Sequence, residues 1–77
     1  MNASMEAIMD AIFQFGMAHL GDRPDEILIG GDHYREIMGA EDVCCFVEFV
    51  DGRPIKIYGI AFKVEPDRKT ITVKKWR

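Results

Sequence analysis

Two histidines and two cysteines are the residues of this chain best suited to bind a metal or act as nucleophiles. Structural zinc sites need four such ligands, which usually recur in pairs such as CxxC or HxxxH. His19, His33, Cys44 and Cys45 match neither spacing. The two adjacent cysteines lie in an apolar stretch, so we expect small core residues rather than reactive thiols. The pattern predicts no metal site, no cofactor and no cysteine–histidine catalysis.

A glycine turn follows a short apolar stretch at Ile29-Gly30-Gly31-Asp32-His33. A strand, a glycine turn and a helix N-terminus can together bind a phosphate group. This segment lacks the third glycine of a dinucleotide site and the Lys-Ser/Thr pair of a P-loop. Asp32 would also place a negative charge where the phosphate would sit. The sequence therefore favours an ordinary turn that leads into a capped helix.

Acidic residues cluster in two places where they could serve acid–base catalysis or bind a partner. One cluster flanks Pro24 and the other follows Gly39-Ala40, which is typical of solvated loops. A chain of 8.8 kDa also has little room for a deep pocket. We therefore expect that the protein is not an enzyme. The acids that we instead assign to a partner-binding face are Asp22, Asp25, Glu26 and Glu41.

The charges are divided unevenly along the chain, although the net charge is only -3. Residues 1–43 hold nine acidic and two basic residues, whereas residues 44–77 hold four acidic and eight basic ones. Neutralisation within one small fold is the favoured interpretation. A basic, aromatic C-terminus could alternatively bind nucleic acid through phosphate contacts and stacking on Trp76. The contacts for this less favoured alternative are Lys69, Lys74, Lys75 and Arg77.

Residues 4–20 have the pattern of a long helix that is apolar over most of its circumference. Ser4 is the expected N-cap, while Gly21 and Pro24 are expected to end the helix. A chain of 77 residues buries only about 60% of its surface, and the sequence predicts no disulfide to stabilise it. We therefore expect a homodimer. The expected self-association residues are Ile8, Met9, Ile12, Phe13, Phe15 and Met17.

The rest of the chain reads as a strand, a short helix and three further strands. The expected strand 26–30 leads into a helix over residues 33–38, which Asp32 caps. An apolar run over residues 43–50 is expected to be a central strand. The hairpin signal Asp51-Gly52-Arg53-Pro54 follows it.

Residues 55–65 read as one long strand with a bulge or a bend at Gly59, because the apolar parity changes there. A turn that begins at Pro66 separates it from a last strand over residues 70–76. The predicted fold class is α+β: a single domain over residues 1–77, in which a three-stranded antiparallel meander packs on the long helix.

Two stretches of the chain resemble a segment of tailed-phage major capsid proteins. Residues 24–38, PDEILIGGDHYREIM, follow the family's order of a proline, a short apolar strand, a small polar turn and a short helix with an aromatic residue. Residues 57–64, IYGIAFKV, are similar to its Gly-Ile-Pro-Val strand, with alanine where proline is usual, and residues 65–67 resemble the turn that follows. The family's extended arm and most of its assembly domain have no counterpart here. The resemblance implies a phage or prophage origin and assigns no activity to any residue.

These observations lead to three hypotheses about function. The first is a non-enzymatic, phage-type accessory or structural protein that acts through protein contacts as a homodimer. The second is a small acidic inhibitor of a host defence complex, similar in role to an anti-CRISPR protein. The third is the nucleic-acid-binding module. With no secretory signal and no apolar run of membrane-spanning length, we expect a protein of the host cytoplasm that does not enter a membrane.

Overall fold

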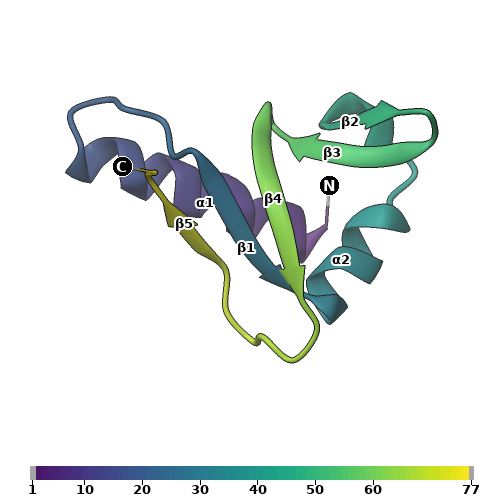
Figure 1. Cartoon of the computed structure of the whole chain (residues 1–77). Coiled ribbons are helices and arrows are strands. Elements are labelled where there is room, and N and C mark those ends of the chain that lie inside the picture. Colours follow the sequence, from purple (N-terminus) through teal and green to yellow (C-terminus); the bar gives the residue numbers. More distant parts are fainter. Residues whose placement is uncertain (1, 77) are drawn as a thin grey trace.

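A computed structural model describes residues 2–76 and shows an α+β fold, as the sequence predicts (Figure 1). A long N-terminal helix precedes a mixed sheet of five strands in the order β2-β3-β4-β1-β5. The elements are α1 (Ala3–Ala18), β1 (Glu26–Gly30), α2 (Gly31–Met38), the 3-10 helix η1 (Val43–Cys45), β2 (Val47–Val50), β3 (Arg53–Ile57), β4 (Ile60–Glu65) and β5 (Thr72–Lys74).

Helix α1 lies across one face of the sheet, behind β5, β1 and β4 in Figure 1. Met5 and Ile8 of α1 share one buried core with Ile27 and Ile29 of β1. Because side chains alternate along a strand, the registry of β1 with β4 and β5 places Phe62, Val64 and Val73 on this same face. The chain therefore has two layers, with the apolar face of its sheet covered by α1.

The opposite face of the sheet is open and polar. Glu26 lies in one row with Lys74 and Ala61, and Leu28 lies in the next row with Lys63 and Thr72. We call this surface the open sheet face. In these two rows of the open sheet face, Leu28 is the one buried apolar side chain.

The N-cap of α1 is Asn2, not Ser4 as the sequence suggested. The Oδ1 atom of Asn2 accepts a hydrogen bond from the backbone N–H of Met5 at 3.1 Å. Ser4 instead lies inside the first turn, where its backbone N–H donates to the carboxylate of Glu36 in α2 at 2.8 Å. The start of α1 is therefore held by a contact between elements, which local capping rules do not include.

Helix α1 ends at Ala18, two residues earlier than predicted, in a Schellman-type turn. The backbone N–H of Gly21 donates to the carbonyl of Gly16 at 2.7 Å. Leu20 takes the left-handed position that usually holds glycine in this motif, with φ of 57°. The following Gly21 is also left-handed, with φ of 89°.

Helix α2 begins at Gly31 and has Gly30, not Asp32, as its N-cap residue. Asp32 lies in the first turn, where a negative charge favours the helix dipole. His33 takes over the capping role, because its Nδ1 accepts the backbone N–H of Gly30 at 2.9 Å. Helix α2 therefore begins two residues earlier than expected and follows β1 directly.

The apolar run over residues 43–50 is not one central strand. Its first part is η1, which is closed by hydrogen bonds from Cys45 N to the Asp42 carbonyl and from Phe46 N to the Val43 carbonyl. Only β2 is extended, and it lies at the edge of the sheet. Cys44 and Cys45 are exposed free thiols, so the expectation that they belong to the core is wrong.

The expected long strand over residues 55–65 is a hairpin of β3 and β4. Tyr58 and Gly59 both have left-handed backbones, with φ of 53° and 76°, and form a two-residue turn. Asp51 and Gly52 form the same kind of turn between β2 and β3, which confirms the hairpin predicted there. The change of parity at Gly59 therefore marks a chain reversal and not a bulge.

The last strand is shorter than predicted and has a different neighbour. β5 pairs antiparallel with β1, while β1 pairs parallel with β4, so β1 lies between the two. The meander therefore consists of β2, β3 and β4, and β5 is not part of it. The turn at Pro66 is confirmed by a hydrogen bond from Arg68 N to the Glu65 carbonyl at 2.9 Å.

Candidate functional site

The structure divides the predicted self-association residues into a buried and an exposed group. Ile8 and Phe15 belong to the core of the single chain and present no surface to another molecule, and Ile12 is half-buried. The exposed fraction is 44% for Met9, and the other two exposed members are Phe13 at 62% and Met17 at 68%.

The three exposed residues form one continuous ridge. Met9, Phe13 and Met17 are spaced four residues apart, so they stand above one another along α1. We call these three residues the α1 ridge. Single exposed hydrophobic residues are common, but three large ones in one row on a helix form an exposed apolar patch, and such patches are frequent at interaction sites.

A shallow groove runs beside the ridge. Two adjoining hollows of about 350 and 320 Å³ share Ile12, Phe13 and Arg23 in their linings. The floor is made by Ile12 and Gly16, and the outer wall by Arg23 and Tyr58. We call this feature the α1 groove. Its lining is mainly apolar, and Gly16 keeps the floor low because it carries no side chain.

The wall of the α1 groove is held by a contact between two loops. The Nη2 atom of Arg23, in the α1–β1 loop, donates to the backbone carbonyl of Tyr58 at the β3–β4 turn. Burial raises the pKa of the Tyr58 phenol, and the charge of Asp42 adds to this shift. The ring of Tyr58 also packs against Phe46 at a centroid distance of 5.7 Å.

Two carboxylates border the ridge on the side away from the groove. Glu6 and Asp10 are exposed and four residues apart, and Asp10 precedes Phe13 by three residues. The α1 ridge is therefore flanked by negative charge on one side and by the guanidinium of Arg23 on the other.

The four acids expected to share one face do not come together. Asp25 accepts the backbone N–H of Trp76 at 2.8 Å, and Glu26 pairs with Lys74 at 3.4 Å. Asp22 lines the α1 groove near the end of α1, whereas Glu41 lines a hollow with Asn2 at the start of α1. A helix of this length separates the last two by about 20 Å.

Two of the four predicted nucleic-acid contacts, Lys74 and Lys75, are engaged within the chain. Lys74 pairs with Glu26, and the Nζ atom of Lys75 donates to the Arg23 carbonyl at 3.5 Å. Lys69 lies in the β4–β5 loop, and Arg77 lies outside the described residues. Acidic and basic segments thus meet between the start of β1 and the end of β5, in line with neutralisation inside the fold.

The Gly30-Gly31 turn has no space for a phosphate group. A Cβ atom on Gly30 would lie 1.9 Å from the backbone carbonyl oxygen of Arg68. Gly31 N donates to the Pro66 carbonyl at 3.3 Å. The β4–β5 loop therefore covers the turn with acceptor oxygens, which repel an anion.

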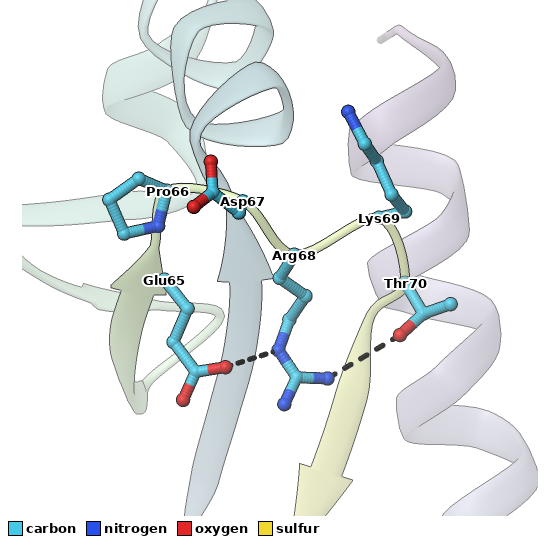
Figure 2. A pocket seen from close by; sticks show the side chains of 6 residues that line it. All are labelled: Glu65, Pro66, Asp67, Arg68, Lys69 and Thr70. Carbon is cyan, nitrogen blue, oxygen red and sulfur yellow. Dashed lines mark hydrogen bonds and ion pairs between the residues drawn. The ribbon is translucent and has the colours of Figure 1, made fainter.

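A hollow of about 460 Å³ is lined by that same loop (Figure 2). Figure 2 shows the Arg68 side chain between Glu65 and Thr70. Its Nε donates to Glu65 at 2.7 Å and its Nη1 to Thr72 at 2.8 Å. Because the Arg68 guanidinium is hydrogen-bonded to these neighbours, it connects the end of β4 to the start of β5 and is not available to a ligand. We call this set of contacts the Arg68 clamp.

The residues described by the structure hold no cluster of three metal-ligating side chains. His19 stacks on Phe15 at a centroid distance of 3.9 Å, and its Nδ1 contacts the Phe15 carbonyl. The pKa of Glu36 is lowered, because Ser4 donates hydrogen bonds from its side chain and its backbone. None of these groups lines the α1 groove.

Sequence reasoning missed three members of this surface: Gly16, Arg23 and Tyr58. Arg23 and Tyr58 reach the surface through the tertiary fold, which no local pattern encodes.

Among residues 2–76, no helix combines the length and apolar character needed to cross a membrane. Comparisons of the chain with protein-family models, with curated proteins and with solved structures found no match.

Proposed function

We propose that the protein is non-enzymatic and acts through protein–protein contacts, with the α1 ridge binding a second copy of the chain. The observation that supports this most directly is the exposure of Met9, Phe13 and Met17 in one row. Fully burying a side chain of this kind is worth about 1.5–3 kcal/mol, and a partner would cover only the part of each side chain that the fold leaves exposed, against the cost of association. Covering these side chains should stabilise a small chain in particular, because such a chain buries only a limited part of its own apolar surface.

A second copy fits this surface because the surface is complementary to itself. Ridge and groove lie next to each other on one helix, with acidic residues and Arg23 on opposite borders. An isologous dimer uses the same patch on both subunits, so such a patch has to contain both partners of each contact. The surface meets this requirement.

The proposed biological setting is that of a phage-type accessory or structural protein in the host cytoplasm. This part rests on the resemblance of residues 24–38 and 57–64 to capsid proteins. The acidic-inhibitor alternative has less support, because its four acids lie in separate places. The nucleic-acid alternative has less support too, because Lys74 and Lys75 are bound within the chain.

The proposal is tested by the variant Phe13→Glu, measured by sedimentation velocity. The Phe13 side chain is 62% exposed, so the fold should persist while association is lost. Gln14→Glu is the matched control, because it adds the same charge at the next exposed position. A dimer that survives Phe13→Glu with unchanged affinity would refute the proposal.

A further inference from the structure

We infer that two copies pack about a two-fold axis that runs along α1, with the helices parallel and each α1 ridge seated in the partner's α1 groove. This inference rests on the proposed function and specifies the geometry of the same surface. It selects one arrangement from two that a helix pair could adopt, and the choice follows from shape and from charge.

Shape provides the first reason. Ile12 and Gly16, the floor of the groove, each precede a ridge residue by one position, so ridge and floor run side by side along the helix. A two-fold axis along α1 exchanges the two sides of the patch and places each ridge over the partner's groove. An axis across α1 would instead stack ridge upon ridge and leave both grooves empty.

Charge provides the second reason. Arg23 forms the outer wall of the groove, and Glu6 and Asp10 lie beyond the ridge on the other side. The axis along α1 brings Arg23 of each copy opposite Asp10 of the partner subunit. The axis across α1 would instead bring the acidic borders of the two copies together on one side of the pair. On the other side it would bring the two Arg23 side chains together. Complementary charges of this kind fix the register of an interface.

Filling the groove tests the shape argument. In Gly16→Leu a side chain replaces the open floor, while the α1 ridge itself is unchanged. Room exists for the new Cβ, whose nearest neighbour would be the Asp22 carbonyl oxygen at 3.7 Å. We expect dimerisation to weaken at least about tenfold, the effect of losing one well-packed side chain. An unchanged dissociation constant in a folded Gly16→Leu variant would overturn the arrangement.

Exchanging the charges tests the orientation. Arg23→Glu alone and Asp10→Arg alone should each weaken the dimer by about threefold to tenfold, since each places like charges together at two symmetric positions. The double variant, Asp10→Arg with Arg23→Glu, should recover to within about threefold of the original affinity. Losses that add up in the double variant, with no recovery, would exclude the parallel pair.

Cross-linking provides a readout that does not depend on Arg23. In a Cys44→Ser, Cys45→Ser background, we expect Met17→Cys and Met9→Cys each to cross-link to itself with a short bismaleimide. A mixture of the two should give no mixed product, because their heights along parallel helices differ by about 12 Å. Lys63→Cys, on the open sheet face, is the control and should give no product.

The outcomes separate this inference from the proposed function. Mixed Met9→Cys and Met17→Cys products, without self-linked ones, would show an antiparallel pair and overturn the geometry alone. An unmodified chain that stays monomeric, together with no cross-linked product at either Met9→Cys or Met17→Cys, would overturn the proposed function as well.

Discussion

Leu20 combines two unusual properties for a single residue. Its backbone is left-handed, which is unfavourable for a side chain with a Cβ atom, and its side chain is 99% exposed. It is the second residue after α1 and follows Met17, the last residue of the α1 ridge, by three positions. The turn that ends α1 accounts for the left-handed backbone, and the exposed side chain is free to extend the contact that we propose for the α1 ridge.

Replacing Leu20 should therefore affect stability and association in opposite directions. Leu20→Gly relieves the left-handed strain and should raise the free energy of unfolding by about 0.5–1 kcal/mol in urea denaturation. The same change should weaken the dimer, as measured by sedimentation. Leu20→Ala is the control, because it removes the apolar contact but retains the Cβ atom. It should weaken the dimer without raising the free energy of unfolding. Equal stability of the Gly and Ala variants would contradict the strain argument.

Glu36 links α2 to the start of α1 and makes stability depend on pH. Hydrogen bonds from Ser4 hold its pKa below the ordinary value of 4.5. A lowered pKa in the folded state means that this stabilisation is present above pH 4.5 and is lost as the pH falls through the folded-state pKa. Glu36→Gln should flatten the decline of thermal stability in this acidic range, and Ser4→Ala should act in the same direction. An unchanged acid slope in Glu36→Gln would contradict the assignment.

At the scale of elements, the junction of β1 and α2 depends on a backbone close approach. The carbonyl of Arg68 leaves no space for a Cβ atom at Gly30. The β4–β5 loop, held by the Arg68 clamp, would have to move if a side chain were added. The identity of this residue is therefore set by a loop that follows it by almost forty positions.

Gly30→Ala should lower the free energy of unfolding by about 3 kcal/mol, in the range of substitutions that force a backbone shift. Gly16→Ala is the matched comparison, because a Cβ there meets only an ordinary contact at 3.7 Å. Gly16→Ala should raise stability by about 0.5–1 kcal/mol through helix propensity. Urea unfolding measures both free energies. If both variants were destabilised equally, the close approach at Gly30 would not be the cause of the loss of stability in Gly30→Ala.

The segment that precedes β2 makes a prediction about its thiols. Because η1 exposes Cys44 and Cys45, both should react with a thiol reagent in the folded protein without prior unfolding. A colorimetric thiol assay in buffer and in denaturant should give two rapidly reacting thiols in each case. Reaction in the folded state only at the rate of global unfolding would place these residues in the core, as the sequence had suggested.

At the scale of the whole molecule, the sequence predicted the features that depend on neighbouring residues, such as helix periodicity and turn residues. The long helix, the strand at 26–30, the Asp51-Gly52 hairpin and the turn at Pro66 are all present. The pairing of β5 with β1 was not predicted, because strand order depends on contacts between segments far apart in the chain.

The candidate site was predicted in the same uneven way. Helical spacing identified Met9, Phe13 and Met17, but an apolar pattern cannot tell an exposed ridge from the buried stripe of Ile8 and Phe15. The groove was not predictable, since its wall joins the α1–β1 loop to the β3–β4 turn. Periodicity thus located the helix, and the tertiary fold decided which of its faces stays open.

The most direct test of the central claim is the molar mass of the unmodified chain, measured by light scattering from about 1 to 500 μM, the range of modest interfaces. If α1 binds a second copy, the molar mass should rise from 8.8 kDa toward twice that value and grow no further. Added salt should weaken the association slightly, because Arg23 and Asp10 border the contact. A mass of 8.8 kDa at every concentration would contradict self-association through α1.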